Sequence, residues 1–334
     1  MVRMSPSADR LAPSPIPSRA ATALLQALVR RTEHSPGGPT RRALSLLRKA
    51  WLAGGDPPVA HRLGGRSLLL PLSHDLPVHQ ARHRDYSRNL GRVVAALRAA
   101  RPAATVVDIG ANVGDSALII REQAPATPIL CIEGDDHFLP FLRANVGGLA
   151  GVEIAPHYVR HSADDEALAV VRAGGTARLV AQDGAPLQGG PGRALEAILA
   201  EHPAFATPGL IKVDTDGHDA DILVEAEGVL AAHRPIVFFE LDPALARAAG
   251  GRDPQDALDL LARLGYRRAL FFTNTGSLAF GLDGAAFAEA RARTRHAAPG
   301  RPVAYFDVCA FGPDDAELAA AVERRERSLV RTDA

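Results

Sequence analysis

The sequence contains few cysteines and no long hydrophobic run. Its only two cysteines, Cys131 and Cys309, lie in apolar runs where cysteine acts as a small hydrophobic residue, and two cysteines build no disulfide framework. No segment supplies about 18 uninterrupted apolar residues, which disfavours a membrane-spanning helix. The N-terminal stretch has Pro and Asp before any apolar run, unlike a secretory leader. We therefore expect a cytoplasmic protein.

Lysine is almost absent, and the basic residues gather near the N-terminus. Lysine occurs only at Lys49 and Lys212, which makes Lys212 a candidate for a special role. Residues 1–104 hold 17 Lys and Arg against 5 Asp and Glu, a charge of +12, which the rest of the chain balances. Two interpretations stay open: this part contacts an acidic partner or a membrane surface, or its arginine-rich helices dock on an acidic core.

What is present is the composition of an ordinary globular protein, 47% hydrophobic and 23% charged. Residues 1–18 are rich in Pro and Ser and are expected to form a disordered tail. Amphipathic helical patterns indicate an N-terminal helical extension over residues 19–100. One α/β domain is expected over residues 101–313, followed by a C-terminal helix or tail over residues 314–334.

From residue 105 onward, short β-branched runs alternate with longer helical ones. This pattern predicts a Rossmann-like, doubly wound, mostly parallel sheet with helices on both faces. Seven strands are expected, in the segments TVVDIG, PILCIEG, VEIAPHYV, LIKVDTD, PIVFFEL, RRALFFTN and VAYFDVCAF. The first five have connections long enough for right-handed parallel crossovers. The last follows a long irregular excursion, residues 275–302, and we expect it to run antiparallel.

The segment VVDIGANVGDSAL has the form of a nucleotide-binding turn with its middle glycine replaced. In a dinucleotide fold that glycine lets the backbone approach a pyrophosphate. Here Asn112 stands between Gly110 and Gly114, and Asp108 adds negative charge. These features disfavour NAD and suit S-adenosylmethionine, whose ammonium and sulfonium groups attract carboxylates and carbonyls. The alternative is an ordinary tight turn between a strand and a helix.

A second group of cofactor-binding candidates follows the next two predicted strands. Glu133 comes nineteen residues after Gly114, in the segment CIEGDD, where a carboxylate can accept both hydroxyls of a ribose. Gly134 follows it in the same loop. Tyr158, after the third strand, either packs on the nucleoside or belongs to the core. These residues predict a bound nucleoside. The turn at Asn112 indicates that it belongs to S-adenosylmethionine rather than to NAD.

With these motifs the chain resembles the FkbM-like methyltransferases, which are class I S-adenosylmethionine-dependent enzymes acting mostly on hydroxyl groups of sugars and natural products. The likeness lies in VVDIGANVGDSAL, CIEGDD, LIKVDTDGHDADIL and PIVFFELDP, and it spans about residues 66 to 311. The resemblance implies that the α/β domain is a class I methyltransferase domain with S-adenosylmethionine as its cofactor. It implies the acceptor only loosely, because the family is broad.

The fourth predicted strand carries the family's motif, which is similar to I-K-x-D-x-E-G-x-E. Lys212, Asp214 and Gly217 match it, whereas Asp216 and Asp219 replace the two glutamates. Asp214 and Asp216 are two residues apart and point the same way if the strand continues, toward the sheet edge where ligands bind. Asp219 opens the next helix and is expected to cap it rather than to act in catalysis.

Methyl transfer to a hydroxyl needs a group that removes the proton. The candidates, in order of preference, are Asp214, Asp216, His218 and Glu240, the last from the fifth strand. Lys212 could orient a carboxylate, lower the pKa of the acceptor, or simply pair with Asp214. The carboxylates could also hold Mg²⁺ through oxygen ligands, although no dedicated metal site is predicted.

We therefore expect an S-adenosylmethionine-dependent O-methyltransferase that acts on a saccharide or another small natural product. Three alternatives stay open: a methyltransferase for a protein or nucleic acid, a nucleotide-linked oxidoreductase, and a non-catalytic binding protein with the same fold. The acidic core and the lack of an RNA-binding module disfavour a nucleic acid. Peripheral membrane contact through the basic N-terminal region also stays open.

Overall fold

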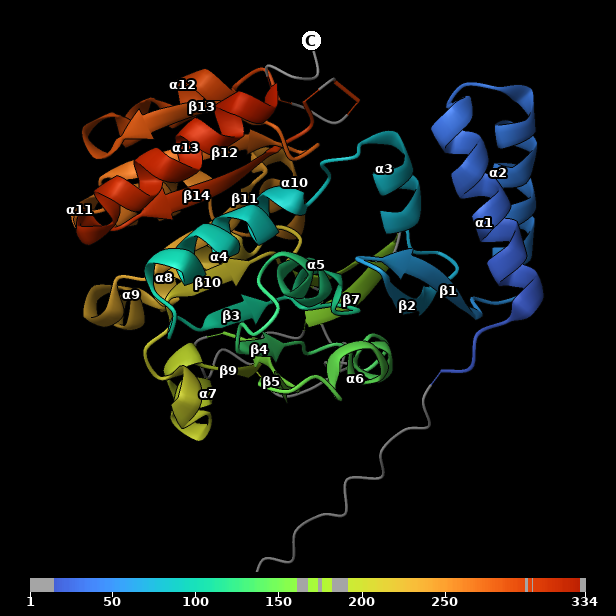
Figure 1. Ribbon diagram of the computed structural model, residues 1–334, viewed down its shortest axis with the longest axis horizontal. Helices are drawn as coiled ribbons and strands as arrows, with labels where there is room; N and C mark the ends of the chain where they lie inside the picture. The colour runs from blue at the N-terminus through green and yellow to red at the C-terminus, as the bar shows by residue number, and fades with distance from the viewer. Residues whose placement is uncertain are drawn as a thin grey trace, which may run out of the picture.

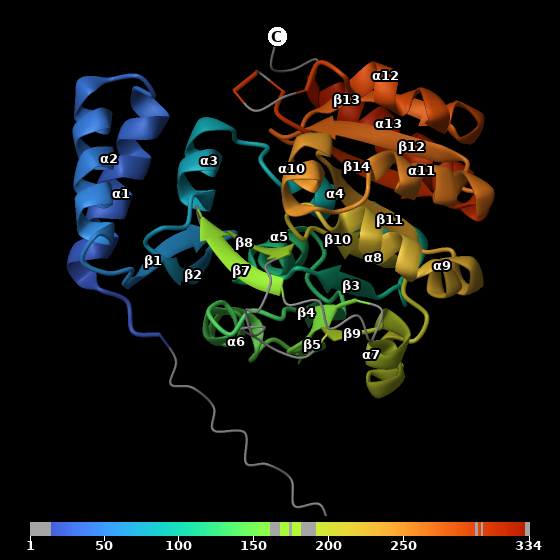
Figure 2. The same cartoon turned by 180° about the vertical axis from the view of Figure 1, so that it is seen from behind.

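The computed structural model describes residues 15–160, 168–173, 176–181, 192–297, 300–301 and 303–330. The first fourteen residues of the predicted disordered tail lie outside this range. A central sheet with helices on both faces forms the main body (Figure 1). The N-terminal helix pair stands to one side, with a small hairpin and a short helix between it and the sheet, as opposite views show (Figures 1 and 2).

The central sheet has eight strands in the order β13-β12-β14-β11-β10-β3-β4-β5. Their bounds are β3 Val106–Ile109, β4 Ile129–Ile132, β5 Val152–Ala155, β10 Leu210–Val213, β11 Ile236–Leu241, β12 Arg268–Thr273, β13 Leu278–Asp283 and β14 Phe306–Phe311. The five strands from β11 to β5 run parallel, and β14 is inserted antiparallel between β11 and β12. The predicted α/β fold and its antiparallel last strand are confirmed.

The sheet holds one strand more than the seven predicted. β13 lies in the segment expected to be irregular and pairs antiparallel with β12 at the sheet edge. Its sequence, LAFGLD, carries Gly281 in the middle and buries only Leu278 and Leu282, so its β-propensity is weak. Pairing across the turn at Gly276, where φ is +88°, makes it a strand.

The central strands form because their short apolar runs are buried on both faces. Successive residues point to opposite sides, so Val106 packs in one core and Val107 in the other. The first core includes residues from α4 (Arg88–Ala100), α5 (Asp115–Gln123), α6 (Leu139–Val146) and α13 (Ala316–Val330). The second includes residues from α7 (Leu195–Glu201), α8 (Asp219–Glu225), α9 (Glu227–His233) and α11 (Pro254–Arg263).

The N-terminal extension combines helices with a short hairpin. It contains α1 (Arg19–His34), α2 (Pro39–Leu52), the antiparallel hairpin β1 (Pro58–Leu63) and β2 (Arg66–Pro71), and α3 (Leu76–Arg82). The hairpin is attached to α6, where Asn145 bonds both the N–H and the carbonyl of Leu69, at 2.8 and 2.7 Å.

The remaining strands and α-helices are β6 Tyr158–Val159, β7 Leu168–Ala173, β8 Thr176–Ala181, β9 Gly192–Arg193, α10 Pro243–Ala249 and α12 Ala290–Thr294.

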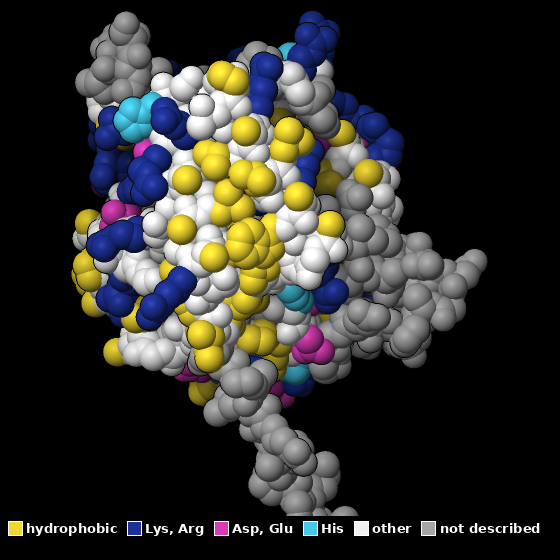
Figure 3. Space-filling view, turned by 90° about the vertical axis from the view of Figure 1, so that its right-hand side faces the viewer, with side chains coloured by type: hydrophobic (Ala, Val, Ile, Leu, Met, Phe, Trp, Pro, Cys, Tyr) yellow, Lys and Arg dark blue, Asp and Glu magenta, His cyan; other side chains and the backbone are white. Residues whose placement is uncertain are grey.

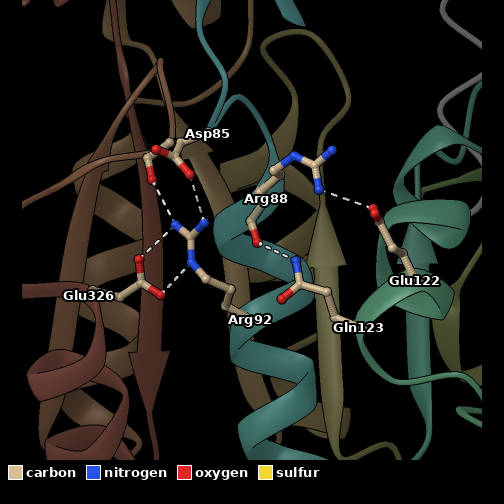
Figure 4. Close-up of polar contacts among 7 residues, drawn as sticks. Asp85, Arg88, Arg92, Glu122, Gln123 and Glu326 are labelled. Atoms are coloured by element: carbon tan, nitrogen blue, oxygen red, sulfur yellow. Dashed lines mark hydrogen bonds and ion pairs between the residues drawn. The ribbon is translucent and has the colours of Figure 1, made fainter. Parts of the chain in front are cut away.

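A buried ion pair joins α4 to the C-terminal helix α13 (Figure 4). The guanidinium of Arg92 donates two bonds of 2.7 Å to the carboxylate of Glu326, and both side chains are buried. It also donates to Asp85 at 3.1 Å and to the carbonyl of Gly276 at 3.2 Å. This single side chain therefore fixes α4 against α13 and the β12–β13 turn.

Within the described part of the chain, no helix combines the length and the apolar character that a membrane crossing requires.

Candidate active site

Two adjoining cavities lie at the sheet edge where the parallel strands end. The turn cavity, of about 330 Å³, is bounded by the loops that follow β3, β4 and β10. The acidic cavity, of about 440 Å³, is bounded by the start of α4, the start of α5 and the facing ends of β11 and β14. Both are lined by Gly110, Asn112, Asp214 and Asp216, so the two spaces meet at these four residues.

The turn after β3 depends on backbone conformations that few residues adopt. Gly110 has a φ of +75°, and a Cβ there would collide with the carbonyl of Asp214. Asn112 has a φ of +49°, in the left-handed region that asparagine tolerates better than most side chains. Its side chain lies beside His74, and its N–H donates to Oε2 of Glu133 at 2.8 Å. Asn112, which stands in place of the glycine, thus keeps the conformation of the turn and ties the turn to Glu133.

Gly114 lies in the same turn but lines neither cavity. Its φ is +86°, and a Cβ there would lie 2.9 Å from Cδ1 of Leu142 on α6. The structure therefore gives Gly114 a packing role, letting α5 start close to α6, in place of the predicted contact with the cofactor.

Glu133 occupies the predicted position at the end of β4 and lines the turn cavity. Its carboxylate accepts the N–H of Asn112 and, at 2.7 Å, the N–H of Asp135. Burial raises the pKa of this carboxyl to about 7. Gly134 and Tyr158 line the same cavity, and a Cβ on Gly134 would collide with the ring of Tyr158.

Lys212 lies beneath the turn in a buried ionic cluster. Its ammonium is 3.0 Å from Oδ1 of Asp108, 3.3 Å from Oδ2 of Asp214 and 3.3 Å from the carbonyl of Gly110. Burial opposes the charge of Lys212, but Asp108 and Asp214 outweigh it and hold its pKa above the ordinary value. Lys212 lines the acidic cavity, as a site residue should.

Asp108 does not fit the direct contact with a cofactor that the sequence predicted. It is fully buried and lines neither cavity. Besides pairing with Lys212, it accepts a short hydrogen bond from the hydroxyl of Ser116. Its carboxylate balances the buried ammonium of Lys212, and it can influence a ligand only through that lysine.

The loop after β10 brings three of the predicted catalytic residues to the cavities. Asp214 is 52% exposed and, like Asp216, lines both cavities. Asp216 has a φ of +54°. His218 lines only the turn cavity, and its Nδ1 is 3.3 Å from Oδ2 of Asp221. Asp214 and Asp216 therefore contact the junction, whereas His218 lies on the side of the turn.

Asp219, the first residue of α8, holds this loop in place. Its buried carboxylate accepts the N–H and hydroxyl of Thr215, both at 3.1 Å, and the N–H of Glu240 at 3.2 Å. Burial raises its pKa to about 7. It lines neither cavity. Its role is structural, as expected, although it bonds the loop and β11 rather than the first turn of α8.

Acidic side chains dominate the wall of the acidic cavity. They are Asp75, Asp115, Asp214, Asp216, Glu240, Asp242 and Asp307. Burial, followed by Asp214 and Asp219, raises the pKa of Glu240 well above its ordinary range. Burial also raises the pKa of Asp307 to about 7. Among the described residues lining this cavity, Lys212 is the only lysine or arginine, so the wall suits donor-rich ligands and repels phosphates.

Sequence reasoning missed several residues of this wall. Tyr86 and Tyr305 bond through their side chains. Asn89, at the start of α4, is fully buried and donates to Oδ2 of Asp307 at 3.2 Å, while its own Oδ1 has no hydrogen-bond partner in the structure. The one available signal was Asp307 itself, a carboxylate within an otherwise apolar strand.

The carboxylates do not form a metal site. Nowhere in the described ranges do three or more His, Cys, Asp or Glu side chains converge as metal ligands. The Mg²⁺ alternative therefore finds no support.

Comparison with known proteins shows what the central domain resembles. Residues 108–268 match the family model described as the methyltransferase FkbM domain. This part of the chain, just under half of it, is similar to that domain. The match begins in β3 and reaches the start of β12, so this domain supplies both the turn cavity and the loop after β10. The resemblance seen in the sequence motifs is thereby confirmed.

Several solved structures show a remote similarity. The methyltransferase FkbM of Methylobacillus flagellatus KT is 16% identical over 50% of this chain and 39% of its own, with a TM-score of 0.32. A precorrin-6y C5,15-methyltransferase of Geobacter metallireducens GS-15 is 12% identical over 66% and 86%, with a TM-score of 0.31. Cofactor-bound Rv0187 from MTB is 14% identical over 66% and 78%, with a TM-score of 0.35. No curated protein matches the chain.

Proposed function

We propose that this protein transfers the methyl group of S-adenosylmethionine to a hydroxyl of a saccharide or another small natural product. The observation that carries the proposal is the junction of two cavities at Gly110, Asn112, Asp214 and Asp216. A cofactor in one cavity and an acceptor in the other would meet there, as a transfer reaction requires. The FkbM methyltransferase domain supports the reaction class.

The residues of the turn cavity fit an S-adenosyl nucleoside. The carboxylate of Glu133 faces the cavity with lone pairs left to accept ribose hydroxyls, and Tyr158 offers an aromatic surface for the base. The carbonyl of Gly110 offers negative charge for the amino acid end and the sulfonium. When bound, the cofactor supplies an electrophilic methyl group.

The same geometry argues against a dinucleotide. In such a site the N–H of the second turn position would be open to the pyrophosphate. Here the N–H of Asn112 is already bonded to Glu133, whose carboxylate would repel a phosphate. A nucleotide-linked oxidoreductase is therefore the weaker candidate.

Asp214 is the group that we assign to accept the proton of the acceptor hydroxyl. Its Oδ2 lies 3.3 Å from the ammonium of Lys212, which orients it, and it lines both cavities. Asp214 would accept the proton of the hydroxyl while its oxygen takes up the methyl group that bound S-adenosylmethionine would supply, with S-adenosylhomocysteine as the leaving group. Asp216 and Glu240 then bind neighbouring hydroxyls of the acceptor, and His218 contacts the cofactor from the turn cavity.

The wall of the acidic cavity defines the acceptor as a donor-rich molecule. Neutral hydroxyls can donate to Glu240, Asp307 and the unpaired Oδ1 of Asn89. A nucleic acid would bring phosphates against the same carboxylates and be repelled. These features favour a saccharide or a polyhydroxylated natural product over a polyanion.

The test combines cofactor binding with label transfer. Calorimetry should detect S-adenosylhomocysteine and not NAD⁺, and labelled methyl groups from S-adenosylmethionine should enter a small-molecule fraction of a cell extract. Asp214→Asn should lower transfer by roughly 10²- to 10⁴-fold, the usual contribution of a general base, and keep the affinity for S-adenosylhomocysteine. The exposed and distant Asp314→Asn serves as the control.

Two results would refute the proposal. One is tight binding of NAD⁺ with no response to S-adenosylhomocysteine. The other is label that enters protein or nucleic acid while the small-molecule fractions stay unlabelled.

A further inference from the structure

The outer face of α2 presents apolar side chains to solvent. Ala43, Leu46, Leu47, Ala50 and Trp51 follow the spacing i, i+3, i+4, i+7 and i+8, which places them on one side of the helix. All five are exposed, with Leu46 at 65%, Leu47 at 57% and Trp51 at 39%. An apolar helix face of this kind normally packs against something.

The opposite face of α2 fixes how this surface is presented. Arg48 is buried and donates to the carbonyls of Leu72 and His74, at 2.8 and 3.1 Å, and to the carboxylate of Asp75 at 2.8 Å. These hydrogen bonds anchor α2 through Arg48 and leave the five apolar side chains facing outward. Because His74 and Asp75 also line the acidic cavity, the anchor connects α2 to the proposed acceptor site.

Basic side chains flank the apolar face. Figure 3 shows a band of hydrophobic side chains across this side of the molecule, with lysines and arginines beside it. Arg42 and Lys49, one heptad apart, are exposed on α2 next to the apolar face, and Arg30 and Arg31 are exposed on α1. Residues 15–56 contain only two acidic residues, Glu33 and Asp56, so this region carries a net positive charge.

We propose that this surface, defined by the five apolar residues of α2 and by Arg42 and Lys49, docks on an anionic membrane. Leucine and tryptophan that enter the boundary of a bilayer, with a basic rim toward the headgroups, are the composition of an interfacial helix. A second copy of this chain fits less well, because a symmetric contact would place the cations of both copies together.

Trp51 provides the probe, because it is the only tryptophan of the chain. The full-length protein is mixed with vesicles of phosphatidylcholine alone or of phosphatidylcholine with phosphatidylglycerol. With the anionic vesicles we expect the emission of Trp51 to shift to the blue, iodide quenching to fall and the protein to sediment with the vesicles. High salt should weaken the binding, since the charge attraction is screened.

Two double variants separate the apolar and ionic contributions. Leu46→Gln with Leu47→Gln should lower the vesicle affinity more than tenfold, since both leucines lose burial in the bilayer. Arg42→Glu with Lys49→Glu should also lower it more than tenfold and remove the preference for anionic lipid. The matched controls on α13 are Leu329→Gln, whose side chain is 36% exposed, and Arg324→Glu with Arg325→Glu.

Three outcomes would overturn the proposal. The first is an emission of Trp51 that does not change with either vesicle. The second is equal loss of binding in the α13 controls. The third is sedimentation of a dimer whose formation, without lipid, depends on Leu46 and Leu47, because the surface would then be an interface between copies.

Discussion

The two cavities share four residues but are built in different ways. The turn cavity is made by loops that directly follow β3, β4 and β10, and its contacts span shorter stretches of chain, such as the 21 residues between Asn112 and Glu133. The acidic cavity is assembled from distant segments. Asn89 and Asp307, which bond across it, are 218 residues apart.

This difference separates backbone geometry from packing. In the turn cavity, the left-handed conformations of Gly110 and Asn112 bring the carbonyl of Gly110 to Lys212 and the N–H of Asn112 to Glu133. In the acidic cavity, the packing of distant segments holds the half-buried carboxylates of Glu240 and Asp307 together, although their pKa values are raised. The first site should therefore respond to local changes, and the second to distant ones.

The largest expected effect comes from breaking the support of the acidic cavity at Arg92. Arg92→Ala leaves Glu326 buried without its cation, so the free energy of unfolding should fall by about 3 to 5 kcal/mol. Guanidinium denaturation measures this. The matched control is Arg88→Ala, on the same helix as Arg92. It removes a more exposed pair with Glu122 of α5 and should cost about 0 to 1 kcal/mol (Figure 4). Equal losses in both variants would contradict the prediction.

The next effect concerns the turn cavity alone. Glu133→Gln removes a charge-assisted contact with the ribose, so the affinity for S-adenosylhomocysteine should fall by about 1.5 to 3 kcal/mol, or roughly 10- to 150-fold. Glu240→Gln, in the acidic cavity, should leave that affinity unchanged, as should Glu153→Gln on β5, which lines neither cavity. Calorimetry compares the three, and a similar loss in all of them would remove the distinction between the cavities.

A smaller effect tests the backbone of the turn. Asn112→Ala places an ordinary side chain in a left-handed conformation, so stability should fall by about 1 to 2 kcal/mol. Asn112→Gly suits the conformation, and it should be less destabilising and keep the N–H on Glu133. Thermal unfolding ranks the two variants, and an alanine variant as stable as the glycine variant would show that the conformation is not decisive.

The same contrast explains what could be predicted from the sequence. Gly110, Asn112, Glu133 and the loop after β10 stand out in the sequence because fixed spacings along the chain carry them, and they line one cavity in the structure. Asn89 and Tyr305 could not be found, since only the fold brings their segments together. The errors have the same origin.

The strand β13 was missed because its propensity is weak and its edge position depends on pairing with β12. Asp108 was assigned to the cofactor because its place after a strand suits a ligand, whereas the structure turns it toward Lys212. Sequence patterns placed the strand ends, and three-dimensional contacts decided where the side chains on them point.

The smallest expected effect is a pH dependence that differs in sign between binding and stability. Burial raises the pKa of Glu133 to about 7, and the ionised carboxylate is the form that accepts ribose hydroxyls. Between pH 7.5 and 6.5 the ionised fraction, and with it the affinity for S-adenosylhomocysteine, should fall about threefold. Glu133→Gln should bind weakly but with no such dependence.

Stability of the unliganded protein should change in the opposite direction. Glu133, Asp219 and Asp307 hold protons in the folded state at pH values where unfolded carboxyls have released them. Stability is therefore lost as the pH rises through about 7 and gained as it falls toward the ordinary carboxyl range. Calorimetry and denaturation across the same pH window test both signs. If affinity and stability moved together, the raised pKa of Glu133 could not be the cause, because one protonation would have to favour both folding and binding.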